Sequence, residues 1–409
     1  MEFNSYKLRN VLMEKGYIRG PFGSALKRSE LLQEGVPVYE QKNAIYNVRT
    51  FRYFVSKEKY EELKRFTVKP YDLLISCSGT VGRTSIITPK DPKGIISQAL
   101  LILRPDVNII NPYYLYYFFQ SKKGHNELIN RSSGSVQVNI AKRNIIENIS
   151  IDLPSISNQK KIVDFLSSLD NKINSNKNII ANLEELSQTL FKRWFVDFEF
   201  PDENGNPYKS SGGEMIDSEL GKTPKNWKVD EIGSYIKIKS GKRPKNKVDS
   251  KDSENVVPVI GASKIMGYTN DYIYNEKIII IGRVGTHGVI QRFSTRTWPS
   301  DNTFVITSDF ESIIYQLLKS IDYVSLNRGS TQPLLSQKDI KNTKVAMPTN
   351  ETLLSTYQKE NNHVLKMMDQ KNIENQKLTQ LRDTLLPKLM SGEIEIPDDI
   401  EVNEDELSI

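Results

Sequence analysis

The chain carries one long internal repeat, and this feature constrains its fold more than any other. The segment YKLRNV at residues 6–11 is similar to WKVDEI at residues 227–232, and the tripeptide VPV at residues 36–38 returns at residues 257–259. Both matches share an offset of 221 residues. A repeat of about 200 residues is far longer than a solenoid unit, so it predicts two whole domains of the same fold.

A second group of matches lies farther along the chain, in segments that contain glycine. The segment LLISCSGTVG at residues 73–82 corresponds to IIIIGRVGTHG at residues 278–288, with the glycines aligned at an offset of 206. The polar loop NRSSGSVQVNI at residues 130–140 returns as NRGSTQPLLS at residues 327–336, at an offset of 195. Because the order of the matches is kept while the offset falls, we infer a duplication followed by insertions and deletions in loops.

Each copy has the same internal plan. Short β-rich segments broken by Gly and Pro come first, followed by an apolar strand, an apolar helix-like stretch, the polar loop and a short strand that ends at proline. This mixed order, without strict alternation of strands and helices, predicts an α+β fold. We expect globular domains at residues 1–155 and 225–350, with a linker at residues 201–224. The aromatic run at residues 113–119 is interpreted as domain core rather than as a stacking platform.

A long helix is predicted after the first domain, within residues 156–200. Residues 158–195 contain neither glycine nor proline, and apolar side chains recur there at the heptad spacing of a coiled-coil seam. Such a helix is about 57 Å long, which argues against the alternative of an amphipathic helix that packs only on its own domain. The seam consists of Ile162, Leu166, Leu169, Ile173, Asn176, Ile180, Leu183 and Leu190, with Ser187 and Trp194 completing the series.

A second long helix, predicted at residues 351–392, closes the second copy and can pair with the first. Asp170 of the first helix corresponds to Asp369 of the second at an offset of 199. If the two helices pair, the connectivity requires them to run antiparallel, with one globular domain at each end and approximate two-fold symmetry. Pro387 is expected to kink or end the second helix. An acidic tail follows at residues 393–409.

Charge is distributed unevenly along the chain. The tail holds eight acidic side chains and no basic one, which leaves 56 basic against 42 acidic side chains, a formal charge of +14, in the remainder. A basic body favours a polyanionic partner such as nucleic acid, although mildly basic cytoplasmic proteins are common. The single cysteine, Cys77, fits a reducing compartment. No signal peptide or membrane span is recognised, so we expect a cytoplasmic protein without a membrane partner.

The sequence contains no complete catalytic set. A methyltransferase would need a Gly-rich cofactor loop and an Asn/Asp-Pro-Pro-aromatic motif, and NPYY at residues 111–114 lacks the second proline. ELGKT at residues 219–223 lacks the first glycine of a phosphate-binding loop, and no His, Cys and Asp cluster has the spacing of a metal site. These absences favour a binding protein over an enzyme. Two similar domains on a rod suit duplex DNA, in which half-sites lie about 34–36 Å apart.

Four stretches of the chain match the pattern of one known family. They are GPFGSALKRSELLQEGVPVYEQKNAI at residues 20–45, SSGSVQVNIAKRNI and ISIDLPSISNQKKIVDFLSSLDNKI within residues 132–173, LFKRWFVDFEFP at residues 190–201 and LRDTLLPKLMSGEIEI at residues 381–396. On these segments the sequence resembles the specificity subunits of type I restriction–modification enzymes over essentially the whole chain. One departure is Asn158, which stands where the family has Glu in a Pro-x-x-Glu-Gln motif.

The resemblance implies two target-recognition domains, each reading one half of a split DNA site, and two helical regions that form an antiparallel coiled coil. It also implies a non-catalytic chain without a cofactor of its own, bound to double-stranded DNA and to two modification subunits that methylate adenine with S-adenosylmethionine. Restriction subunits, which use ATP and Mg²⁺, would join through the modification subunits.

Matching loops then give the residues expected to face DNA. Lysines more often hold phosphates, whereas Gln, Asn and some Arg more often read bases. The set in the first domain is Lys27, Arg28, Gln41, Lys42, Asn43, Ser78, Thr80, Arg83, Ser133, Ser135 and Gln137, and the set in the second is Lys242, Arg243, Lys245, Ser263, Lys264, Arg283, Thr286, His287, Arg328, Ser330 and Gln332. The competing hypothesis is a non-catalytic protein scaffold that uses the coiled coil and has no DNA specificity.

Overall fold

The computed structural model describes residues 2–22, 25–130, 139–284, 288–326 and 334–397. The chain divides into two compact units. Unit 1 comprises Met1–Ser175 and Asn375–Ile409, and unit 2 comprises Asn176–Glu374. Each unit therefore contains one globular part together with half of each long helix.

Unit 1 is built on a four-stranded antiparallel sheet with the order β2-β8-β5-β6. A three-stranded sheet, β4-β3-β7, joins an antiparallel and a parallel pair. Two short ladders, β1 with β11 and β9 with β10, complete the unit. The strands are β1 (Asn4–Lys7), β2 (Leu12–Arg19), β3 (Val36–Tyr39), β4 (Phe54–Val55), β5 (Leu73–Ser76), β6 (Thr84–Ile86), β7 (Ile95–Ile96), β8 (Leu100–Pro105), β9 (Ile129–Asn130), β10 (Asn139–Ile140) and β11 (Ser150–Leu153).

Unit 2 repeats the two larger sheets of unit 1 and its β1–β11 ladder. Its four-stranded sheet has the order β15-β21-β18-β19, its three-stranded sheet the order β17-β16-β20, and β14 pairs with β22 as β1 pairs with β11. The parallel pair recurs as well, in β16 and β20. The α+β fold with a duplicated domain is thus confirmed. The strands are β14 (Trp227–Glu231), β15 (Lys237–Ser240), β16 (Val257–Ile260), β17 (Ile265–Thr269), β18 (Ile278–Gly282), β19 (Ile290–Phe293), β20 (Trp298–Pro299), β21 (Thr303–Thr307) and β22 (Lys344–Pro348).

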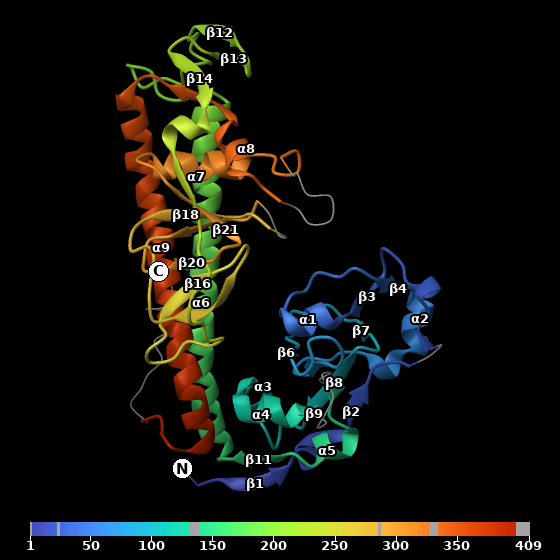
Figure 1. The fold of residues 1–409 in the computed structure, drawn as a ribbon. Coiled ribbons are helices and arrows are strands. Elements are labelled where there is room, and N and C mark those ends of the chain that lie inside the picture. Colours follow the sequence, from blue (N-terminus) through green and yellow to red (C-terminus); the bar gives the residue numbers. More distant parts are fainter. Residues whose placement is uncertain (1, 23–24, 131–138, 285–287, 327–333, 398–409) are drawn as a thin grey trace. The chain divides into compact units, whose positions relative to one another are not determined.

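One helix covers the main sheet of each unit on the side of the long helices (Figure 1). In unit 1 this is α3 (Pro112–Gln120), which begins where Asn111 Oδ1 accepts a hydrogen bond from the Tyr113 amide at 2.9 Å. Proline at its first position favours the same start. The aromatic side chains of α3 are mostly buried, as expected for core. The remaining short helices are α1 (Gln41–Ile45), α2 (Lys57–Glu62), α4 (Lys122–Leu128), α5 (Arg143–Glu147), α7 (Glu311–Ser320, the counterpart of α3) and α8 (Gln337–Lys341).

The long helices α6 (Ile156–Phe191) and α9 (Glu351–Ser391) pack against each other within each unit. In unit 1 the first half of α6 meets the last half of α9, where Arg382 Nη1 donates to Asp170 Oδ1 at 2.7 Å. In unit 2 the end of α6 meets the start of α9, and the Phe195 and Tyr357 rings lie 4.9 Å apart. The predicted antiparallel pairing is therefore confirmed. Pro387 lies inside α9, which continues to Ser391 instead of breaking at the proline.

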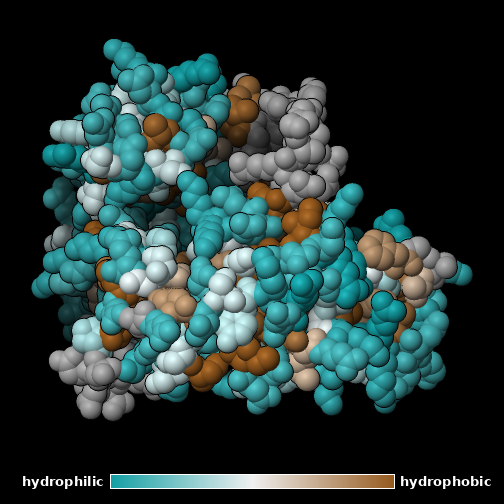
Figure 2. All heavy atoms as spheres, turned by 90° about the horizontal axis from the view of Figure 1, so that it is seen from below, coloured by the Kyte–Doolittle hydropathy of each residue, from teal (hydrophilic) through white to brown (hydrophobic). Residues whose placement is uncertain are grey.

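The end of α6 and the following segment form an aromatic cluster in unit 2. A π-helical turn at Lys192–Val196 buries Trp194 and Phe195, and the Trp227 ring packs 5.5 Å from Phe200. The predicted linker at residues 201–224 contains a hairpin of β12 (Met215–Ser218) and β13 (Gly221–Pro224). Glycine suits its turn because residue 221 has a φ of +89°. Figure 2 shows hydrophilic side chains over most of the face that it draws.

Candidate DNA-binding surfaces

A pocket of about 510 Å³ in unit 1 gathers several of the residues predicted to face DNA. It includes Arg28, Gln41, Lys42 and Ser78 of that set. Arg52 and Gln98 also line it, and sequence reasoning missed them because neither lies in a segment with a recognised match in the second copy. Lys27 is exposed beside Arg28. Its backbone N–H donates to Glu30 Oε2 at 2.6 Å, so the side-chain ammonium is not held by that contact.

The turn that follows β5 forms one wall of this pocket. Gln41 Nε2 donates hydrogen bonds to the backbone oxygen and the side-chain hydroxyl of Ser78, which ties α1 to the turn. The buried Ser76 hydroxyl fixes the other side of the turn, donating to the Thr80 oxygen and accepting from the Arg83 amide at 3.0 Å. The side chains of Ser78, Thr80 and Arg83 are exposed. A short turn fastened at both sides can thus present three polar side chains to a ligand.

Asn43 corrects the predicted set. Its side chain is 0% exposed, so it cannot face DNA. The Asn43 Oδ1 atom accepts from the Glu40 amide at 2.7 Å, and Nδ2 donates to the Val48 oxygen at 2.9 Å and to the Thr50 oxygen at 3.2 Å. A buried amide with its donors and acceptor occupied by backbone has a structural role. Asn43 therefore holds the loop after α1.

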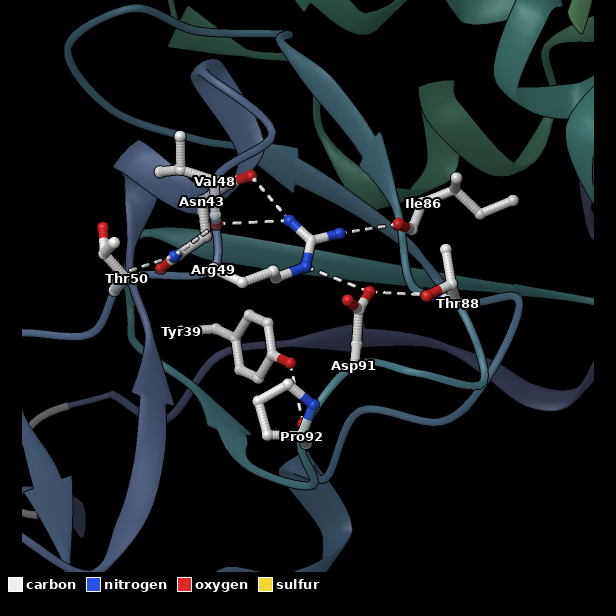
Figure 3. A network of polar contacts seen from close by, with 9 residues as sticks. All are labelled: Tyr39, Asn43, Val48, Arg49, Thr50, Ile86, Thr88, Asp91 and Pro92. Carbon is white, nitrogen blue, oxygen red and sulfur yellow. Dashed lines mark hydrogen bonds and ion pairs between the residues drawn. The ribbon is translucent and has the colours of Figure 1, made fainter. Parts of the chain in front are cut away.

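Arg49 completes this local network, which Figure 3 shows from close by. Its guanidinium donates to the Ile86 oxygen at 2.8 Å and pairs with Asp91 at 3.0 Å. Below it, the buried Tyr39 hydroxyl donates to the Pro92 oxygen at 2.7 Å, and burial raises the pKa of Tyr39 to about 12. The network fastens the loop after α1 to the strand β6. This arginine is consequently occupied and is not a candidate for DNA binding.

Unit 2 presents its basic side chains on loops that meet at β20. Lys242, Arg243 and Lys245 are exposed after β15, and the Trp298 indole N–H donates to the Lys242 oxygen at 2.7 Å. Ser263 and Lys264 are exposed in the turn between β16 and β17. That turn adjoins β20, because β16 pairs with β20 in parallel.

Both units bring two chain segments into unusually close approach beside these loops. A Cβ atom on Gly20 would lie 2.0 Å from the Ser97 oxygen, and one on Gly241 would lie 2.1 Å from the Ser300 oxygen. Only glycine fits at such a distance. The loops that follow β2 and β15 are therefore held against the strand connections in the same way in each unit.

Arg283 follows β18 and is half-buried, with its guanidinium 5.4 Å from the centre of the Phe304 ring. The other predicted residues lie outside the described residues, so their placement is not part of the structure. They are Ser133, Ser135, Gln137, Thr286, His287, Arg328, Ser330 and Gln332.

The seam residues face the helix pair or the core beside it. Ile162, Leu166, Ile173 and Asn176 are buried, and Leu169, Ile180, Leu183 and Leu190 are half-buried. The corresponding aspartates each bind an arginine, as Asp170 pairs with Arg382 at 2.7 Å and Asp369 with Arg292 at 2.8 Å. Among the described helices, none combines the length and the apolar character that crossing a membrane requires. The described residues also contain no His, Cys, Asp and Glu group able to hold a metal ion.

Comparison with known proteins gives one consistent result. The specificity subunit of the type I restriction enzyme MjaIX of Methanocaldococcus jannaschii is 25% identical over 394 residues, covering 86% of this chain and 85% of that protein. The HindI specificity subunit of Haemophilus influenzae is 23% identical, covering 73% of this chain and 81% of that protein. The crystal structure of a type I restriction–modification S subunit from M. genitalium shares the fold, with a TM-score of 0.56 at 16% identity over 98% of this chain and 97% of that one.

A sequence model of one protein family covers most of the chain in two blocks. The family is described as the type I restriction modification DNA specificity domain, and the blocks are residues 22–185 and 224–383. Each block falls on one copy of the repeat. The chain therefore belongs to the type I restriction–modification specificity subunit family.

Proposed function

We propose that this chain is the DNA-reading subunit of a type I restriction–modification complex, with one half of a split target read by each unit. The observation that carries the proposal is the repetition of one sheet topology in both units, each with exposed basic and hydroxyl side chains on the loops after equivalent strands. Two copies of one fold with different loop residues suit two different half-sites, because direct readout depends on the side chains presented.

The residues proposed to contact DNA differ in their expected roles. We assign phosphate contacts mainly to the lysines, since an ammonium recognises charge without reading a base. Gln41 and Gln98, in the pocket of unit 1, are candidates for base contacts, because amide side chains pair with adenine edges. In the undescribed loops, Gln137 is assigned to the half-site of the first domain and Gln332 to that of the second.

The partners follow from the same proposal. Two modification subunits, which carry S-adenosylmethionine, would dock along α6 and α9, and restriction subunits with ATP and Mg²⁺ would join through them. The turn at Lys192–Val196 supports docking near the end of α6, because Val196 is 53% exposed while Trp194 and Phe195 are buried within unit 2. The chain itself supplies recognition rather than catalysis, and we place it with DNA in the cytoplasm.

Binding of the chain together with its modification partner tests this function. Methylation-aware sequencing of the host genome identifies the target, and the purified complex should then protect one bipartite sequence against nuclease. Affinity should fall steeply as salt rises, because phosphate contacts release counterions. A complex that assembles but binds DNA without sequence preference would support the scaffold instead.

The helix pair provides a second, geometric test. Deletion of one heptad from both α6 and α9 should shorten the spacer that the complex tolerates between half-sites, by about 10 Å at 1.5 Å per residue. The matched control is a variant with seven seam-compatible residues replaced rather than removed. An unchanged spacer in the deletion variant would contradict the role of the helices in spacing the half-sites.

A further inference from the structure

Each unit places one arginine at the same end of its main sheet, but the two arginines come from different strands. In unit 1 it is Arg19, the last residue of β2, and in unit 2 it is Arg283, which follows β18. The β2 strand and the β18 strand are not counterparts in the repeat, because β2 corresponds to β15 and β18 to β5. The arginine has therefore changed strand between the two copies.

Strand pairing establishes which residues correspond. Arg19 lies opposite Leu101 on β8, and Ser240 lies opposite Phe304 on β21, so Ser240 is the counterpart of Arg19. Each is followed by a glycine at which two chain segments approach closely, Gly20 after Arg19 and Gly241 after Ser240.

The position of Arg283 is occupied by Cys77 in unit 1. The Cys77 amide donates to the Ala99 oxygen at 2.8 Å, and the Arg283 amide donates to the Asn302 oxygen at 3.0 Å. These are equivalent bonds at the ends of β5 and β18. Unit 1 thus has Arg19 at the first position and Cys77 at the second, whereas unit 2 has Ser240 at the first and Arg283 at the second.

Each guanidinium lies near a residue at this end of its sheet, Cys77 for Arg19 and Phe304 for Arg283. Burial raises the pKa of the Cys77 thiol to about 11, and the nearby Arg19 guanidinium opposes this rise. Because β8 lies between β2 and β5, an Arg19 side chain that approaches Cys77 passes over β8. In unit 2 the Arg283 guanidinium lies over Phe304 on β21, the strand that corresponds to β8. Arg19, on one neighbour of β8, and Arg283, after the opposite neighbour of β21, thus flank corresponding strand ends.

Neither charge is compensated within the described residues. Arg19 Nη1 and Arg283 Nε are shielded from solvent and have no hydrogen-bond partner there, although the Arg19 side chain does bond the Cys77 sulfur, and no described carboxylate pairs with either side chain. The Cys77 thiol is neutral at physiological pH and cannot serve as the counter-ion. Outside the described residues, acidic side chains occur only in residues 398–409. A partly buried cation without an anion is unfavourable, which points to an anion supplied by a ligand.

We propose that Arg19 and Arg283 are equivalent phosphate-binding residues, each of which holds one backbone phosphate at the half-site of its own unit. The proposal rests on the proposed DNA-reading function. Both side chains are oriented by a ring, since Arg19 lies 5.6 Å from the Phe22 centroid and Arg283 lies 5.4 Å from that of Phe304. A guanidinium held in place by an aromatic face has its donors pre-oriented for a phosphate.

The test measures the salt dependence of DNA binding by the complex of this chain with its modification partner. In Arg19→Ser and in Arg283→Ser, the slope of log K against log salt should fall by about 0.9, the loss expected for one phosphate contact. The preferred base sequence should stay unchanged, because phosphate contacts carry no base readout. Arg65→Ser is the matched control, because the Arg65 guanidinium also lies over an aromatic ring, 5.1 Å from the Phe66 centroid. Its slope should equal that of the unmodified complex.

The change of strand between the units supplies a rescue variant. Arg19→Ser combined with Cys77→Arg gives unit 1 the residues that unit 2 has naturally, and it should restore the slope lost in Arg19→Ser alone. Arg283→Cys combined with Ser240→Arg gives unit 2 the residues of unit 1, and it should restore the salt slope lost when Arg283 alone is replaced. Thermal unfolding without DNA must show that each variant is folded before its binding is compared.

The outcomes separate the inference from the function on which it rests. If the unmodified complex binds a bipartite target and the folded Arg19→Ser and Arg283→Ser variants keep its salt slope, the two arginines do not bind phosphate. If a variant instead relaxes the preference for one base pair, the arginine reads a base and the assignment to phosphate is overturned. Failure of the unmodified complex to recognise any bipartite target would refute the proposed function itself.

Discussion

Arg292 offers the sharpest test of how a recognition sheet is attached to the long helices. It lies on β19 with a side chain only 7% exposed, and it binds Glu311 at the start of α7 and Asp369 on α9. Burial alone would lower the pKa of Arg292, but the two carboxylates outweigh this effect and raise it. The network joins the sheet of unit 2, its covering helix and the long helix α9 through one charged group.

Replacement of Arg292 by Met removes this charge and keeps a side chain of similar length. Glu311 and Asp369 are 11% and 19% exposed, so both carboxylates are left in a poorly solvated place. The remaining cation, Lys277, lies 3.9 Å from Glu311 and is itself mostly exposed. Removal of one partner from a buried ion pair typically costs about 3–5 kcal/mol, and we expect unit 2 to be destabilised by that amount.

Hydrogen exchange followed by mass spectrometry measures this loss separately for each unit. Amides of β18, β19 and α7 should exchange about 100-fold faster or more in Arg292→Met, while those of β5 and β8 in unit 1 should be unaffected. The matched control is Arg382→Met in unit 1, because Arg382 is 28% exposed, its partner Asp170 is 25% exposed, and the Tyr117 hydroxyl still donates to Asp170 at 2.8 Å. Its effect should be only about 1 kcal/mol, because solvent stabilises the uncovered carboxylate.

The triple variant that adds Glu311→Gln and Asp369→Asn should recover most of the lost stability at neutral pH, because it removes the two uncompensated charges. Equal exchange rates in Arg292→Met and the unmodified chain would refute the reasoning, as would a triple variant less stable than Arg292→Met.

Three further predictions follow from single contacts. Burial of Glu184 favours the neutral acid, but the Lys319 ammonium and neighbouring hydrogen bonds outweigh this effect and lower the pKa of Glu184. The ionised carboxylate therefore stabilises the fold at neutral pH, and this stabilisation is lost in acid. The difference in unfolding free energy between the unmodified chain and Glu184→Gln, measured by urea titration, should shrink below about pH 4.5. Gly20→Ala should loosen unit 1 only, and Gly241→Ala unit 2 only, as hydrogen exchange would show, because each Cβ would overlap a backbone oxygen. Tyr357→Ala should destabilise unit 2 by about 4 kcal/mol, whereas Tyr357→Phe should cost about 1 kcal/mol, since the hydroxyl only accepts one hydrogen bond from Asn361.

The architecture was predictable from the sequence because it depends on patterns repeated over many residues. Heptad spacing identified the two long helices, and the connectivity then required them to be antiparallel. The repeat identified two domains, since a shared order of matches survives many substitutions in loops. The hairpin at β12 and β13 was missed because its sequence, MIDSELGKTP, gives little apolar alternation.

Individual site residues were less predictable, because a polar residue in a loop can serve the fold or a ligand with the same chemistry. Asn43 and Gln41 are two positions apart in α1, yet Asn43 points inward to backbone groups and Gln41 reaches the exposed turn at Ser78. Composition does not distinguish these directions. They depend on which face of a short helix packs on the sheet, which only the assembled domain reveals.

The two arginines show a deeper reason why matching the copies finds the fold better than the site. The repeat aligns Arg283 with Cys77 and Arg19 with Ser240, so residue-by-residue comparison suggests that neither arginine has been kept. In the folded units both residues nevertheless stand at the same end of corresponding strands. A phosphate responds to the place and orientation of the charge and not to the strand that supplies it. Selection on such a contact can therefore preserve a position in space while the alignment changes, and the salt slopes of the exchanged variants measure whether it has done so.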